Sequence, residues 1–71
     1  MLKSTEDLID AELKYARTKH PHWSDNAPLN YLIIAEEFGE IAKAFNDGDL
    51  ELMKKEAAQT IATLVRFLEK E

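Results

Sequence analysis

Cysteine is absent from this chain of 71 residues. Disulfides and thiolate metal sites are therefore excluded. A domain this short buries too little surface for a large core, and such chains usually need a disulfide, a metal ion or a partner subunit. The composition thus leaves two means of support, which are a metal ion held by oxygen ligands and oligomerisation.

Glycine and long apolar runs are also scarce. The two glycines exclude a glycine-rich loop that cradles phosphates. The longest apolar run, residues 31–35, is too short to span a bilayer. The N-terminal segment has no apolar stretch of the kind found in signal peptides, so we expect a cytoplasmic protein that does not bind membranes.

Acidic residues exceed basic ones by 14 to 9, which gives a formal net charge of -5. A chain with this charge has no general electrostatic attraction to nucleic acids or anionic lipids. A phosphate ligand would therefore need a neutralising partner, and a divalent cation is the obvious candidate.

Three segments have the periodicity of amphipathic helices, and we expect an all-α single domain over residues 1–71. The predicted helices cover residues 5 to 19 or 20, residues 28–45, and residues 49 to near the C-terminus. No segment alternates as a strand does. The expected ends are set by residues that cap or break helices, namely Ser4 or Thr5, Pro21, Asp25 or Asn26, Pro28 and Asp49.

Apolar residues form one stripe on each of the two later helices, and each stripe is predicted to face the core. The short turn at residues 46–49, with Gly48 at positive φ, predicts that these helices are antiparallel. Further apolar residues outside the last stripe, such as Val65 and Phe67, predict a second buried face. We therefore expect a homodimer or a dimer of dimers that completes a larger helical bundle. The stripes are Ile34, Phe38, Ile41 and Phe45, and then Leu50, Met53 or Ala57, Ile61, Leu64 and Leu68.

Acidic side chains flank these stripes. Glu37 and Glu40 lie at the edge of the first stripe, Glu36 points more towards solvent, and Glu56 and Gln59 lie beside the second. Antiparallel packing would bring these edges together, and their carboxylates would repel one another without a cation such as Mg²⁺ or Mn²⁺. The alternative is a solvated acidic surface with lysine ion pairs, and spacing alone favours that alternative.

Two motifs in the second half of the chain resemble a known family. The segment AEEFGEIAKAF, residues 35–45, resembles the EE-x-G-E-(I/V)-A-K-A helix of MazG-like nucleoside triphosphate pyrophosphohydrolases. The segment KEAAQTIA, residues 55–62, follows at a suitable spacing and resembles the family's second helix, whose pattern is E-x-x-D. The loop around Trp23 is also similar to the segment before the motif in small phage- and cassette-type relatives.

This resemblance implies a metal site and a reaction. Glu37, Glu40, Glu56 and Gln59 would be ligands of Mg²⁺, or of Mn²⁺, and Glu36 would act with Glu37 and Glu40 in catalysis. The reaction would convert a nucleoside triphosphate to a monophosphate and pyrophosphate, which removes unwanted nucleotides. Gln59 replaces the Asp of the family pattern and brings a carbonyl oxygen without charge, which predicts weaker metal binding.

Four residues are candidate substrate contacts, and two rival functions stay open. Trp23 could stack on a nucleobase or pack over the helix ends. The rivals are a metal- or nucleotide-binding relative without turnover and a helical interaction module with solubilising acidic edges. His20 and His22 are interpreted as plain surface residues. The candidate substrate contacts are Trp23, Asn30, Lys43 and Lys55.

Overall fold

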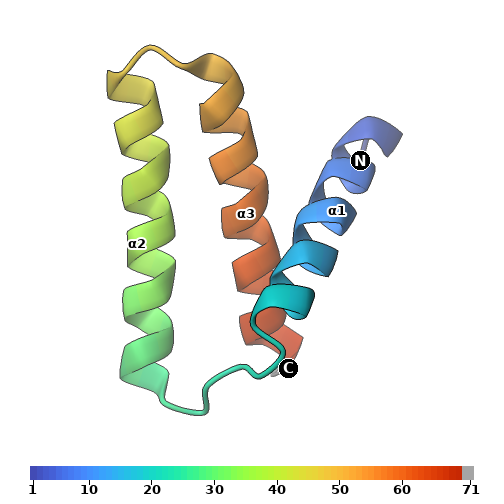
Figure 1. Ribbon diagram of the computed structural model, residues 1–71, viewed down its shortest axis with the longest axis vertical. Helices are drawn as coiled ribbons and strands as arrows, with labels where there is room; N and C mark the ends of the chain where they lie inside the picture. Colours follow the sequence, from blue (N-terminus) through green and yellow to red (C-terminus); the bar gives the residue numbers. More distant parts are fainter. Residues whose placement is uncertain (70–71) are drawn as a thin grey trace.

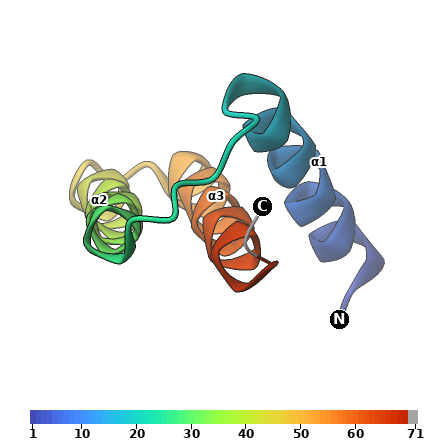
Figure 2. The same cartoon turned by 90° about the horizontal axis from the view of Figure 1, so that it is seen from below.

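The computed structural model describes residues 1–69 and contains three helices, α1 (Lys3–Lys19), α2 (Ala27–Asn46) and α3 (Leu50–Glu69) (Figure 1). α2 and α3 are antiparallel neighbours, while α1 packs on another side of α3. Within the described chain, α1 does not pack against α2. Figure 2 shows the result, with α3 between the other two helices and the loop 20–26 passing beneath it. The predicted all-α fold is confirmed.

The signals for helix ends were mostly read correctly. α1 ends at Lys19, just before Pro21. Asn26 caps α2, because its side chain accepts a hydrogen bond from the backbone nitrogen of Leu29 at 3.0 Å. Asp49 caps α3 in the same way, and Gly48 adopts a φ of 71° in the turn before it. None of the helices among residues 1–69 is long and apolar enough to cross a membrane.

The predicted start of α1 was wrong. The helix begins at Lys3, after Leu2, and no side chain caps it. Ser4 and Thr5 therefore lie inside the first turn. An ion pair between Lys3 and Asp7, 2.9 Å long, supports this turn in place of a cap.

The core consists of small side chains. Ala44, Ala58 and Ala62 are the buried hydrophobic residues among residues 1–69, and no large side chain there is fully buried. Small residues let the helix backbones approach closely but bury little apolar area. The isolated chain therefore has the weak core that its length predicts.

The apolar stripe predicted on α2 is only partly buried, because Ile34 and Ile41 are half-buried and the two phenylalanines are exposed. Phe38 is 57% exposed and Phe45 is 68% exposed. The side of α2 that faces α3 instead carries Asn30, Glu37 and Ala44, at steps of two helical turns. Small and polar residues make the closest contact, so both phenylalanines are turned away from it.

The stripe predicted on α3 is likewise only partly buried, because Met53, Ala57 and Leu64 are half-buried. Leu50, Ile61 and Leu68 are exposed rather than buried. The buried residues of α3 are Ala58, Thr60, Ala62 and Arg66, which serve the contacts with α1 and α2.

Candidate functional site

A cleft of about 590 Å³ lies between α1 and α2, with α3 as its floor. It forms because α1 and α2 pack on different sides of α3, so that side chains from every helix and from the loop border one space. Its volume is in the range of small-molecule sites. The polar and aromatic side chains that line it include Glu12, Tyr15, Lys19, His20, His22, Trp23, Glu36, Glu37, Gln59 and Arg66.

Negative charge concentrates at Glu37. Its Oε2 atom is buried and has no hydrogen-bond partner among residues 1–69. Burial raises the pKa of the Glu37 carboxyl above its ordinary value, and nearby carboxylates raise it further. In order of effect, these carboxylates belong to Glu56, Glu40, Glu36 and Glu12. Acids from all three helices therefore act on one half-buried carboxyl group.

The oxygen atoms around Glu37 suit a hard divalent cation in kind. Among residues 1–69, no group of three or more Asp, Glu, His or Cys side chains is gathered closely enough to hold a metal ion. Mg²⁺ does not need such a cage, because it keeps several waters and often binds one or two carboxylates together with substrate phosphates. Glu37 and Glu56, which interact between α2 and α3, supply that number. Gln59, in the cleft lining, can add a carbonyl oxygen.

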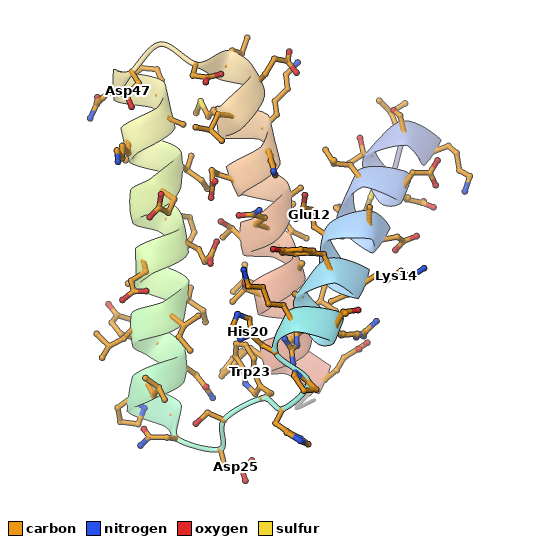
Figure 3. The ribbon with its side chains drawn as sticks, in the orientation of Figure 1. Glu12, Lys14, His20, Trp23, Asp25 and Asp47 are labelled. Atoms are coloured by element: carbon orange, nitrogen blue, oxygen red, sulfur yellow. The ribbon has the colours of Figure 1, made fainter. Side chains whose placement is uncertain are left out.

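Basic and aromatic side chains occupy the loop end of the cleft, where Figure 3 places His20 and Trp23. Arg66 is only 3% exposed there. Its guanidinium donates hydrogen bonds to the carbonyl oxygens of Ala16, at 3.1 Å, and His20, at 2.5 Å. It also lies 5.5 Å from the centroid of the Trp23 ring. Arg66 thus ties the end of α1 and the loop wall of the cleft to α3.

The structure brings together part of the set predicted from the sequence. Trp23, Glu36, Glu37 and Gln59 all line the cleft. Glu40 is exposed and Glu56 is half-buried, and both are close enough for their charge to act on Glu37. The acidic cluster is therefore assembled from the predicted residues, with Glu12 added from α1.

The other predicted substrate contacts are placed elsewhere. Asn30 is buried, and its Nδ2 atom donates to the carbonyl oxygen of Ser24 at 3.0 Å, so it supports the loop beneath the cleft. Lys43 and Lys55 are exposed and do not line the cleft.

The sequence analysis did not predict that α1 contributes side chains to the cleft. Glu12, Tyr15 and Lys19 line the cleft, and their spacing of three and four residues places them on one side of a helix. That spacing was the available signal. His20 and His22 are exposed, as expected, but they also belong to the cleft wall.

Comparisons of the chain with protein-family models, with curated proteins and with solved structures found no match. The features of this chain that bear on a function are therefore the cleft, its acidic side chains and the sequence motifs that supply them.

Proposed function

We propose that this protein is a Mg²⁺-dependent nucleoside triphosphate pyrophosphohydrolase of the MazG-like type. The observation that carries the proposal is Glu37, a half-buried carboxylate that borders a cleft of ligand size and is repelled by acids from all three helices. Such an arrangement destabilises the fold unless a cation relieves the repulsion. A divalent cation with a polyphosphate ligand meets both the charge and the volume of this site.

The proposed reaction is hydrolysis between the α and β phosphates. Water attacks the α-phosphorus, the bond from this phosphorus to the bridging oxygen breaks, and the nucleoside monophosphate and pyrophosphate leave. Bound Mg²⁺ supplies charge neutralisation and a more acidic water. Glu37 and Glu56, with Glu40 and Gln59 beside them, would hold the ion, and Glu36 in the cleft wall would orient the attacking water.

Trp23 provides a surface for the nucleobase at the loop end of this cleft. Its position in the lining supports the role expected from the sequence. Lys43 and Lys55 are left out of the proposed site, because they lie outside the lining. The biological role that fits this activity is removal of unwanted nucleotides.

We expect pyrophosphate release from a nucleoside triphosphate when the protein is assayed with a panel of canonical and modified nucleotides in the presence of Mg²⁺. Excess EDTA should abolish the release, because the carboxylates cannot neutralise phosphates by themselves. Pyrophosphate and monophosphate are measured together to locate the cleaved bond. Release of inorganic phosphate alone would contradict the proposal, since it indicates cleavage at the γ phosphate.

A protein that binds Mg²⁺ and nucleotides but never releases pyrophosphate would be a binding relative. The uncharged Gln59 gives a reason for this outcome, because it weakens the ligand set. A protein that binds neither would instead be a helical interaction module. Calorimetric titration with Mg²⁺ and with nucleotide separates these two rivals.

The proposal includes a second copy of the chain. The two stripes have exposed residues, which include Phe38 and Phe45 on α2 and Ile61 and Leu68 on α3. At 100° per residue, both stripes are rotated from the α2–α3 contact line in the same sense. Because the helices are antiparallel, the stripes emerge on one side of the pair, while the cleft-lining residues Ile33 and Glu36 lie on the other side of the α2 contact line. We call this surface the hairpin face.

An isologous contact through the hairpin face would complete a four-helix bundle and bury the large side chains that the single chain leaves exposed. The alanine core gives the reason that such burial is needed. The face lies opposite the cleft, so a homodimer, or a dimer of such dimers, leaves the cleft open to substrate.

Replacing Phe38 by Glu should weaken self-association by about 100-fold, because a charge at the centre of an apolar interface loses its hydration. Sedimentation velocity should show a dimer or larger assembly for the wild type and a monomer for the variant. Leu32→Glu is the matched control, since Leu32 is 56% exposed on the same helix but lies outside the hairpin face. Dissociation by both variants, or a monomeric wild type, would contradict the proposed assembly.

A further inference from the structure

The Lys19 side chain brings a positive charge to the lining of the cleft. Lys19 and Arg66 are the lysine and arginine residues in its lining. Arg66 is engaged with two backbone carbonyls and the Trp23 ring. Lys19 is exposed, and no carboxylate among residues 1–69 lies within ion-pair distance of it. Its charge is therefore available to a ligand.

Tyr15 holds the Lys19 side chain on the cleft side of α1. The Nζ atom of Lys19 donates to the Tyr15 hydroxyl at 3.2 Å and lies 5.6 Å from the centroid of the Tyr15 ring. Both partners are neutral, so they orient the ammonium group without cancelling its charge. Tyr15 itself lines the cleft.

The C-terminal end of α1 also has features that suit an anionic ligand. Unpaired carbonyl groups at a helix C-terminus repel anions. Here Arg66 donates to the carbonyl oxygens of Ala16 and His20, which brings a positive charge to this end. In the same wall, the buried Nε1 atom of Trp23 has no acceptor among residues 1–69. An oxygen-rich anion complements both features.

We infer that Lys19 binds the polyphosphate of the substrate. This inference rests on the proposed function, and it identifies the cation that Lys43 and Lys55 do not provide. Lys19 stands on the α1 wall of the cleft, while Glu36 and Glu37 stand on the α2 wall. A polyphosphate between these walls would meet the ammonium group on one side and the metal-holding carboxylates on the other.

The test uses inorganic tripolyphosphate, which carries the charge of the substrate without a base or sugar. Calorimetry, with and without Mg²⁺, gives the dissociation constant, and fluorescence of Trp23, the one tryptophan in the chain, locates the ligand at the cleft. Lys19→Met should weaken binding about tenfold and lower its dependence on salt. Lys19→Arg should retain most of the affinity.

Lys14→Met is the matched control. Lys14 lies on the same helix but outside the cleft lining, and Figure 3 shows its side chain pointing away from the other helices. This variant removes the same charge, so it corrects for the change in net charge, and its affinity should stay within about twofold of the wild type. Equal losses in Lys14→Met and Lys19→Met, or no binding of tripolyphosphate by the wild type, would overturn the role of Lys19.

Failure of the role of Lys19 can be distinguished from failure of the proposed function. Pyrophosphate release that is indifferent to Lys19→Met would retain the enzyme and remove this residue from it. Binding of tripolyphosphate that depends on Lys19, in a protein without turnover, would retain the anion site and remove the enzyme.

Discussion

Replacing Glu37 by Gln should abolish pyrophosphate release and, in the same protein, raise thermal stability near neutral pH. The first effect follows from loss of a charged metal ligand, for which we expect a fall in turnover of about 100-fold or more. The second follows from the acids around this carboxyl, because Gln removes a charge that burial and four neighbouring carboxylates disfavour.

The stability effect depends on pH in a defined direction. The pKa of Glu37 is raised in the folded protein, so its stabilising contribution is complete below the ordinary glutamate pKa. That contribution is lost as the pH rises through the higher folded pKa. The wild type and Glu37→Gln should therefore have similar Tm values at about pH 4 and separate progressively towards about pH 8, with the variant more stable.

Circular dichroism melts across this pH range, with and without Mg²⁺, measure the effect. Mg²⁺ should raise the Tm of the wild type, because it binds the folded carboxylates, and should leave the variant almost unchanged. Glu51→Gln is the control, since this α3 side chain is 87% exposed and its ion pair with Lys54 lies on the surface. A variant that loses activity but is less stable at neutral pH would contradict the proposed charge cluster.

The sequence alone predicts only part of the charge cluster around Glu37. The two motifs predict every residue of the cluster except Glu12, and the structure places Glu37 and Glu56 within electrostatic reach of each other. Local chemistry also predicted where helices stop and start, because Pro21, Asn26 and Gly48 act through their own backbone or side chain. Such signals need no knowledge of the rest of the fold.

The direction of the helix faces needed that knowledge. Bulky Phe38 and Phe45 were expected to face the core, but Glu37 and Ala44 make the contact with α3. Hydrophobicity identifies an apolar side of a helix and does not say whether the same chain or another copy covers it. For a short chain this distinction decides the burial of most large side chains.

The position of α1 was still less accessible. It depends on Arg66, which bonds to carbonyl oxygens 50 and 46 residues earlier in the chain. Backbone acceptors leave no pattern in a sequence, so an arginine that binds them resembles any other charged residue on a helix. The cleft wall formed by α1 therefore could not be predicted from one sequence.

Arg66 should accordingly have the largest effect on stability. Arg66→Met keeps the aliphatic length but removes the side-chain donor to the carbonyl oxygens of Ala16 and His20 and the contact with Trp23. The Ala16 carbonyl oxygen keeps its hydrogen bond from the backbone nitrogen of His20. Loss of charge-assisted hydrogen bonds at a buried position costs about 2–4 kcal/mol. A chain of this size has a total stability of only about 4–10 kcal/mol, so the Tm should fall by about 10 °C or more.

Thermal melts give the stability, and Trp23 fluorescence shows whether the loop wall has separated from α3. The emission of Trp23 should move to longer wavelength in folded Arg66→Met, as the ring gains contact with water. Arg17→Met is the control, because Arg17 is 44% exposed and its ion pair with Glu69 lies on the surface, so the change should stay within about 1 kcal/mol. If both variants melt with the wild type, Arg66 does not hold α1 in place, and the cleft loses the residue that fixes its wall.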